Sequence, residues 1–314
     1  MAIPPEQNLS ESAGQDVGVN VPSKSASTPA GALFKPRVWP LFVVLLVVFL
    51  ALVLLQAIAG AVLVLIQVAG GEPVDQMELA DWLRSAPVFV MNLILAFLCM
   101  AGGATLFGWL SARRAGCSLA DRLGLRWRSF SLPSLVVFLL GSVPVFMLSL
   151  GAVYLVSLVF PPGGWLPELY RSMTTPWAIV FIMAIGVFPG IGEELLFRGY
   201  VQRRMLQRCG PWVAIGVTSI LFGLVHVTPQ GIALATILGV WLGLLAWRTD
   251  SIWPSACCHA FVNSGWNVYQ VGRLHWGIPE VPPLWFSVIG GGVVLAAGLV
   301  SLWILAKLQP GSTA

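Results

Sequence analysis

Three short polar clusters interrupt a chain that is otherwise mostly apolar. Each cluster contains a pair of residues four positions apart: Glu194 with Arg198 (preceded by Glu193), Phe222 with His226, and His259 with Asn263. On a helix such residues share a face, so each cluster presents its side chains in one direction. A carboxylate and an imidazole facing one cavity can hold and deprotonate a water molecule, as a general base for peptide hydrolysis. A second His with an Asn supplies hydrogen-bond donors for a tetrahedral oxyanion.

The two adjacent glutamates differ in the partners available to them. They lie at the end of an apolar run, residues 177–192, that reads as a membrane helix. A charge in hydrocarbon costs roughly 2.5–3.5 kcal/mol on insertion scales, so this carboxylate pair requires a partner or a function. Glu194 can pair with Arg198 on one helix face. Glu193 points about 100° away, which leaves it available for a different partner.

The same side chains are compatible with other roles. Glu193, His226 and His259 could bind one zinc ion through imidazole nitrogens and a carboxylate oxygen. The zinc-protease sequence H-E-x-x-H is absent from the chain, and a metal-free glutamate mechanism is equally compatible. Taken singly, Glu194 could form a structural ion pair and Asn263 an interhelical hydrogen bond. The joint occurrence of all three clusters favours a shared chemical function.

Composition predicts an integral, multi-pass membrane protein. Of the 314 residues 57% are hydrophobic and 10% are charged, whereas soluble domains carry about 25% charged residues. The net charge of +4 requires no nucleic-acid partner. The expected partners are the lipid bilayer and a membrane-associated protein or peptide substrate. Five cysteines without framework spacing predict no disulfide scaffold.

The apolar runs predict an all-α, polytopic transmembrane bundle of about eight spans. The expected spans lie near residues 39–69, 87–110, 133–160, 175–198, 211–228, 231–247, 252–270 and 283–307. We divide the chain into a disordered polar tail (1–34), N-terminal transmembrane helices (35–170), a catalytic core (171–275) and a last helix with a short tail (276–314). Between the fourth and fifth spans, Gly210-Pro211 predicts a turn.

The basic residues predict the orientation of these spans. In the eight-span arrangement, 14 of the 17 Lys and Arg residues fall on one side and three on the other. Because cytoplasmic segments carry the excess of positive charge, both termini are expected to be cytoplasmic, in the cell (inner) membrane.

A count along the chain suggests how two of the clusters meet. Glu193 lies 17 residues before Gly210, and His226 lies 16 residues after it. At about 1.5 Å per residue, both lie roughly 25 Å from the turn on antiparallel neighbours. The sequence therefore predicts that Glu193 and His226 reach a similar depth.

The three clusters resemble the motifs of the type II CAAX prenyl endopeptidase and bacteriocin-processing (Abi, or CPBP) family of intramembrane proteases. Residues 192–201 resemble its E-E-x-x-x-R motif, 221–226 its F-x-x-x-H motif, and 253–263 its H-x-x-x-N motif. Order and spacing agree over residues 175–270. Arg122-Leu-Gly-Leu-Arg126 also resembles a sequence common ahead of that core.

The resemblance implies a role for each matched residue. Glu193 would activate the hydrolytic water with His226 as its partner, and His259 and Asn263 would form the oxyanion site. Glu194 would orient His259 or pair with Arg198, and Phe222 would line the cavity. Members of the family are often labelled metalloproteases, so the resemblance leaves the zinc question open.

The resemblance does not select a substrate. Eukaryotic relatives remove the last three residues of prenylated proteins, whereas many bacterial relatives are tied to bacteriocin maturation, self-immunity or membrane-protein processing. Two alternatives to a protease stay open at this point. One is a non-catalytic immunity or scaffold protein that binds a peptide or lipid, and the other is a proton-coupled transporter.

Overall fold

A computed structural model of the chain describes residues 37–70, 85–127, 130–163, 165–280 and 282–309. Every regular element in these ranges is a helix, which confirms the all-α prediction. The predicted disordered tail, residues 1–34, lies outside the described residues. The helices, in chain order, are α1 (Trp39–Ala69), α3 (Ala86–Ala115), α4 (Leu119–Leu123), α5 (Leu132–Ser157), α6 (Trp165–Ser172), α7 (Thr175–Glu194), η1 (Leu195–Gln202), α8 (Arg203–Leu206), α9 (Pro211–Leu224), α10 (Pro229–Thr249), α11 (Trp253–His275) and α12 (Leu284–Lys307).

The count of eight spans is not confirmed, although each expected span coincides with a helix. Six segments of the described chain are long and apolar enough to cross a membrane: α1, α3, α5, α7 through α8, α10 and α12. Helix α9 has 14 residues and is therefore about 21 Å long, shorter than a hydrocarbon core of about 30 Å. Helix α11 has 23 residues but carries polar side chains such as His259 and Asn263.

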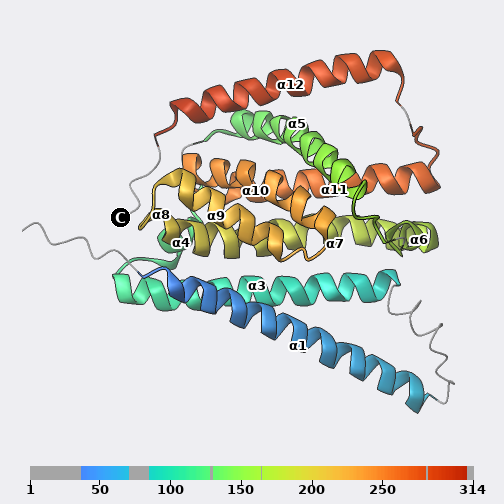
Figure 1. The fold of residues 1–314 in the computed structure, drawn as a ribbon, viewed down its shortest axis with the longest axis horizontal. Helices are drawn as coiled ribbons and strands as arrows, with labels where there is room; N and C mark the ends of the chain where they lie inside the picture. Colours follow the sequence, from blue (N-terminus) through green and yellow to red (C-terminus); the bar gives the residue numbers. More distant parts are fainter. Residues whose placement is uncertain (1–36, 71–84, 128–129, 164, 281, 310–314) are drawn as a thin grey trace, which may run out of the picture. The chain divides into compact units, whose positions relative to one another are not determined.

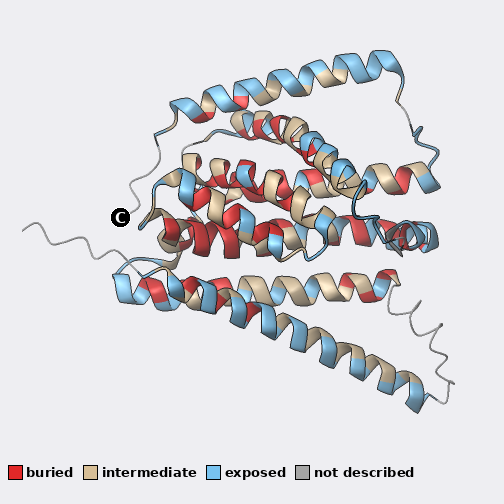
Figure 2. Cartoon of the chain, viewed as in Figure 1, coloured by how far each residue is buried: buried red, intermediate tan, exposed pale blue. Residues whose placement is uncertain are grey.

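The central helices carry most of the buried residues. Helix α7 packs against α3 and α11, and α10 packs against α9 and α5 (Figure 1). Helix α1 lies on α3, and α12 lies on α5. Figure 2 shows that the buried residues gather on the central helices, whereas α1 and α12 are mostly exposed. Their exposed side chains, such as Leu54 and Leu299, are apolar and suit contact with lipid.

Small residues bring α7 and α11 close together. A Cβ atom on Gly190 would lie 3.0 Å from Cβ of Ala260 and 3.2 Å from the carbonyl oxygen of Ala256. The approach is closer still at Gly186, one turn earlier on α7, where a Cβ atom would lie 1.9 Å from Oγ of Ser264 on α11. In lipid, helices associate through such close backbone approach and through interhelical hydrogen bonds. This contact fixes the position of the glutamates, which occupy the next turn of α7.

The polypeptide changes from α-helix to π-helix directly after the glutamate pair. Residues Leu195–Gln202 form η1, where an uninterrupted α-helix was expected. A π-helix has i→i+5 hydrogen bonds and a wider turn, and such segments occur frequently at functional sites. The wider turn brings Glu194, Arg198 and Gln202 almost into one row along the helix. All three residues are buried.

The contact between α7 and α11 can be tested at one glycine. Gly190→Leu should lower the free energy of unfolding by about 1–3 kcal/mol or more, because the added side chain has no space against α11. Gly265→Leu is the matched control, since a Cβ atom at Gly265 of α11 meets nothing within 4 Å. Thermal unfolding of both variants in detergent micelles measures the difference. Equal midpoints for the two variants would contradict the close packing.

Candidate active site

A fully buried ion pair lies at the centre of the predicted site. Oε1 of Glu194 is 2.7 Å from Nη1 of Arg198, and both side chains have 0% exposure. The same Oε1 is 3.1 Å from Nδ1 of His259 on α11. Nη2 of Arg198 donates to the carbonyl oxygen of Gly239 on α10, at 3.1 Å. The pair therefore connects α7 and η1 to both α10 and α11.

Phe222 on α9 contacts the residues of all three sequence clusters. The guanidinium carbon of Arg198 lies 4.3 Å from the centre of the Phe222 ring, within cation–π distance. The rings of His226 and His259 meet the same ring edge-on, with centroid distances of 5.1 and 5.8 Å. Phe222 was predicted to line the cavity; in the structure its ring is the surface against which both imidazoles pack.

The two glutamates face opposite nitrogens of one imidazole. Glu194 approaches Nδ1 of His259, whereas Oε2 of Glu193 lies 3.8 Å from Nε2 of the same ring. The Glu193 side chain is 15% exposed, and its Oε2 atom is buried with no hydrogen-bond partner among the described residues. Oε1 of Glu194 thus has two partners, Arg198 and His259, although its Oε2 has none; Glu193 is the more exposed of the two carboxylates, and its Oε2 is available to bind a water molecule.

His226 occupies a turn rather than a helix, which corrects the sequence prediction. Helix α9 ends at Leu224, four residues before the expected end of that span. The chain turns here because Thr228 caps the start of α10, its hydroxyl accepting from the backbone N–H of Gly231 at 3.1 Å. The predicted turn at Gly210-Pro211 is present, and α9 begins at Pro211.

The position of His226 differs from the predicted pairing with Glu193. Within the described ranges, no hydrogen bond or ion pair joins Glu193 to His226. Nδ1 of His226 lies 2.9 Å from the carbonyl oxygen of Phe222, which can only accept. The ring proton therefore lies on Nδ1, and in the neutral ring Nε2 carries a lone pair that can accept a proton.

Asn263 donates a hydrogen bond to a backbone carbonyl of α7 that lacks its usual helical donor because of a proline. Pro189 lies inside α7 and has no N–H for the carbonyl of Ile185, four residues earlier. Nδ2 of Asn263 donates to that Ile185 oxygen at 3.3 Å. Asn263 therefore serves as an interhelical hydrogen bond between α11 and α7, and the second N–H of its amide is left for another acceptor.

Sequence reasoning missed three buried polar residues around the site. Nε2 of Gln202 donates to the carbonyl oxygen of Gly243 at 2.8 Å, one turn beyond the Arg198 contact with α10. Asn267 donates to the backbone oxygen of Asn263 at 2.8 Å and accepts from the Tyr170 hydroxyl at 2.6 Å. Gln202 and Asn267 continue the four-residue spacing of their clusters, so that spacing could have identified them. Nothing in the sequence indicates that α6 delivers Tyr170.

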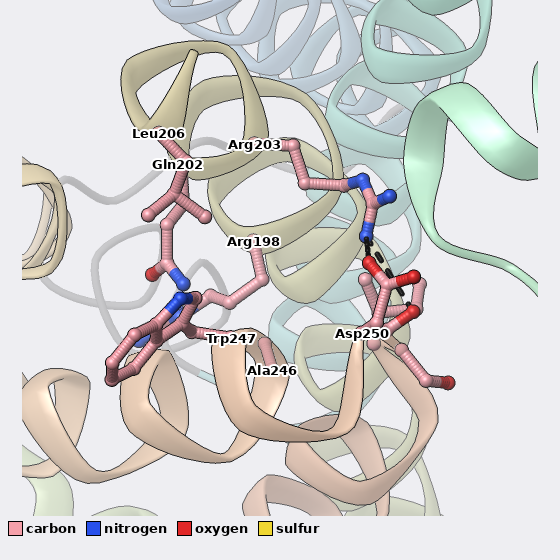
Figure 3. Close-up of a pocket in the computed structure, with 9 residues that line it drawn as sticks. Arg198, Gln202, Arg203, Leu206, Ala246, Trp247 and Asp250 are labelled. Atoms are coloured by element: carbon pink, nitrogen blue, oxygen red, sulfur yellow. Dashed lines mark hydrogen bonds and ion pairs between the residues drawn. The ribbon is translucent and has the colours of Figure 1, made fainter. Parts of the chain in front are cut away.

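A narrow crevice lies behind Arg198, between η1 with α8 and the end of α10 (Figure 3). Arg203 closes it through an ion pair with Asp250, at 2.7 Å between Nη1 and Oδ1. The crevice has a volume of about 10 Å³, which is room for about one water molecule. Nε of Arg198 and Oε1 of Gln202 are buried without partners among the described residues. A single water molecule in the crevice can therefore bind these two groups, but the crevice is too small for a peptide.

The residues proposed as zinc ligands do not assemble into a metal site in this structure. Within the described ranges, no group of three or more His, Cys, Asp or Glu side chains could hold a metal ion. Protein zinc sites use at least three such side chains. Glu193 and His259 approach each other, but His226 does not join them.

The helices and the site define an integral membrane protein with a buried Glu–Arg–His network. Residues 175–265 match the model of a protein family described as Rce1-like, type II CAAX prenyl endopeptidase. A search of curated proteins and a search of solved structures found no match. The matched segment runs from the start of α7 into α11 and contains all three polar clusters. The predicted resemblance to the CAAX prenyl protease (CPBP) family is confirmed over this segment.

Breaking the buried ion pair should strongly destabilise the protein. Arg198→Met should lower the free energy of unfolding by about 3–5 kcal/mol, because Glu194 would be left as an unpaired buried charge. Removing both charges, in Glu194→Leu with Arg198→Met, should restore part of that loss. Thermal unfolding in detergent micelles measures these changes.

The matched control is Arg171→Met in α6. Arg171 and Glu168 form an exposed pair at 3.4 Å, with side-chain exposures of 63% and 65%, and such pairs contribute about 0–1 kcal/mol. If Arg198→Met unfolded at the same temperature as Arg171→Met, the buried pair would not have the stabilising role assigned to it.

Proposed function

We propose that this protein is an intramembrane endopeptidase that hydrolyses peptide bonds of membrane-associated proteins or peptides. The single observation that carries the proposal is the contrast between the two glutamates around His259. Glu194 is fully buried and its Oε1 is bound by both Arg198 and the imidazole, whereas Glu193 is 15% exposed and its Oε2 faces Nε2 of His259 at 3.8 Å without a hydrogen-bond partner among the described residues. The family match over residues 175–265 supports a protease of the CAAX prenyl type.

In the proposed mechanism, Glu193 is the general base. Its free Oε2 binds a water molecule and takes one proton as the water oxygen attacks the peptide carbonyl carbon. His226 assists by accepting a hydrogen bond from the same water at Nε2. When the tetrahedral intermediate collapses, Glu193 returns the proton to the leaving amine, so that the carboxylate is regenerated with the two products.

His259 and Asn263 are the proposed donors to the oxyanion. Because Nδ1–H of His259 donates to the Glu194 carboxylate, His259 can donate from Nε2 only as the doubly protonated imidazolium, which is the form proposed for this step. Nε2 faces the carboxylate of Glu193 at 3.8 Å, next to the position proposed for the attacking water. The second amide N–H of Asn263 is available once the first binds the Ile185 carbonyl. Preorganised donors in a low-dielectric site stabilise a developing negative charge strongly, because they need no reorganisation during the reaction.

Glu194 and Arg198 act as positioning residues in this scheme. Glu194 accepts from Nδ1 of His259 and so fixes the ring with Nε2 toward Glu193. Arg198 holds the other side of the network through Gly239 and the Phe222 ring. We further propose that both termini are cytoplasmic and that the protein resides in the cell membrane, as the distribution of basic residues predicts.

Glu193→Gln should reduce cleavage by about 10²–10⁴-fold, because it removes the general base while keeping the size of the side chain. Cleavage is measured by proteomics of C-terminal and internal neo-termini in membranes that contain wild type or variant. Those neo-termini also reveal whether substrates end in a prenylated C-terminus. Glu168→Gln, at an exposed glutamate of α6, is the control for loss of one carboxylate.

If membranes that contain Glu193→Gln at the normal protein level show the same neo-termini as wild type, the peptidase proposal is contradicted. That result would favour the alternative of a non-catalytic membrane protein that binds a peptide or lipid.

The proposed mechanism requires no metal ion, and removal of zinc tests this. Cleavage by purified protein should continue unchanged after treatment with a strong zinc chelator, since Glu193 itself activates the water. Metal analysis of the untreated protein accompanies the assay. Stoichiometric zinc, with loss of cleavage on chelation and recovery on zinc addition, would replace the metal-free mechanism by one with a metal-bound water.

A further inference from the structure

The short stretch between α3 and α5 takes no part in the proposed chemistry, but it contacts the helices that carry the site. It contains α4 and the sequence Arg122-Leu-Gly-Leu-Arg126, which resembles one common ahead of the catalytic core. Helix α4 packs against α3 and η1, at the end of the bundle where α8 lies (Figure 1). We call residues 123–125, at the centre of this sequence, the α4 connector.

Two carbonyl groups of the α4 connector bind the start of α11. The carbonyl oxygen of Gly124 accepts from the backbone N–H of Ile252 at 3.0 Å, and that of Leu125 accepts from Nε1 of Trp253 at 2.6 Å. Ile252 is the N-cap of α11, and Trp253 is its first residue. His259 lies on the same helix, about two turns further on. The two hydrogen bonds therefore fix the end of α11 nearest to His259.

The third carbonyl group of the α4 connector lies against η1. A Cβ atom on Gly199 would be 3.0 Å from the carbonyl oxygen of Leu123, so even a methyl group there would require the connector or η1 to move. The Leu123 side chain is buried against Gly108 of α3, where a Cβ atom would lie 2.8 Å from its Cδ2. Gly199 directly follows Arg198, the cation of the buried ion pair. The contact therefore fixes η1 next to that cation.

Local interactions hold the α4 connector in one conformation. Gly124 has a φ of 67°, in the left-handed region that favours glycine, and so ends α4. The backbone N–H of Leu125 then donates to the carbonyl oxygen of Ala120 at 2.8 Å. Directly after the connector, Arg126 binds Asp121 with two nitrogens, Nε to Oδ1 at 2.7 Å and Nη2 to Oδ2 at 2.8 Å. Such two-point pairs restrict orientation, so the connector carbonyls have a defined direction.

Gly124 also leaves the space that an ion pair needs. Nη1 of Arg203, which follows η1, lies 2.7 Å from Oδ1 of Asp250, and a Cβ atom on Gly124 would lie 2.7 Å from the same Nη1. Asp250 is the C-cap of α10, the helix whose Gly239 carbonyl binds Arg198. The α4 connector therefore lies where η1, α10 and α11 approach one another.

We propose that the α4 connector is a positioning element for the candidate active site. It holds η1, which carries Arg198, at a fixed distance from α11, which carries His259. Oε1 of Glu194 hydrogen-bonds to both of these side chains, at 2.7 and 3.1 Å. A displacement of η1 relative to α11 by about 0.5 Å would take the longer bond out of hydrogen-bond range. The inference rests on the proposed peptidase function for its effect on rate, but not for its effect on structure.

Gly124→Ala tests the connector, with Gly116→Ala as the matched control. Both glycines have a φ of 67°, so alanine meets the same backbone strain at either position. At Gly124 the new methyl group must displace Arg203 or the connector, whereas at Gly116 it meets nothing within 4 Å among the described residues. Gly124→Ala should raise the hydrogen-exchange rates of backbone amides in residues 195–202 and 252–259 by about tenfold, measured by mass spectrometry on the full-length protein. Gly116→Ala should exchange like wild type.

Trp253→Phe is the second variant, and it also serves if Gly124→Ala does not fold. It removes the N–H donor to the Leu125 carbonyl and keeps an aromatic ring at the start of α11. Exchange should rise in η1, although the substitution lies on a different helix. Trp285→Phe, at an exposed tryptophan of α12, is its control and should exchange like wild type.

Peptide cleavage gives a second measurement. In Gly124→Ala, kcat should fall by about 10- to 100-fold, because a displacement of catalytic groups by about 1 Å can cost 10²-fold in rate. KM should stay within about twofold of wild type, since the connector does not contact the substrate in this scheme.

Three results would overturn the positioning role. They are unchanged exchange of η1 in both connector variants, equal effects of Gly124→Ala and Gly116→Ala, and a rise in KM with kcat unchanged. If exchange responds as expected but wild type cleaves no peptide, the peptidase proposal fails and the positioning role is supported. The two proposals can therefore fail independently.

Discussion

The buried ion pair between Glu194 and Arg198 is the interaction on which the site depends. Two charges without solvent contact are tolerated only when hydrogen bonds satisfy the remaining donor and acceptor atoms. Here α11 supplies His259 to the carboxylate, and α10 supplies the carbonyl of Gly239 to the guanidinium. The Phe222 ring covers the face of the cation. The groups that bind this one charge pair therefore come from three helices, α9, α10 and α11, besides the continuous segment of α7 and η1 that carries it.

Close backbone approach makes these contacts sterically accessible. In lipid, helices gain little from burying apolar side chains, because the surrounding acyl chains are equally apolar. Gly239 and Gly243 lie one turn apart on α10 and present bare carbonyls to Arg198 and Gln202, at 3.1 and 2.8 Å. A Cβ atom on Gly243 would lie 2.7 Å from the Gln202 side chain. Gly239 and Gly243 thus allow Arg198 and Gln202 to reach the backbone of α10. Gly190 plays the same part where α7 approaches α11.

Much of the helical fold could be predicted from sequence, whereas part of the local geometry could not. Apolar run length located every long helix, and Gly210-Pro211 located the turn before α9, since these signals act over a few residues. The four-residue spacing indicated which side chains share a face. The early end of α9 was missed because the Thr228 cap of α10 takes precedence over an apolar run that continues to Val227. The π-helix was missed because its backbone geometry depends on contacts with other helices.

The glutamates lie between two interruptions of regular α-helix, and this placement explains their different environments. Pro189 removes a backbone hydrogen bond one turn before Glu193, and η1 begins directly after Glu194. The backbone between these points is therefore positioned largely by neighbouring helices, through the Asn263 amide on one side and Arg198 on the other. Such irregular segments are where proteins hold functional groups in arrangements that a regular helix would not give. Within this segment Oε1 of Glu194 binds both Arg198 and His259, whereas Oε2 of Glu193 faces the other nitrogen of His259 with no hydrogen-bond partner among the described residues.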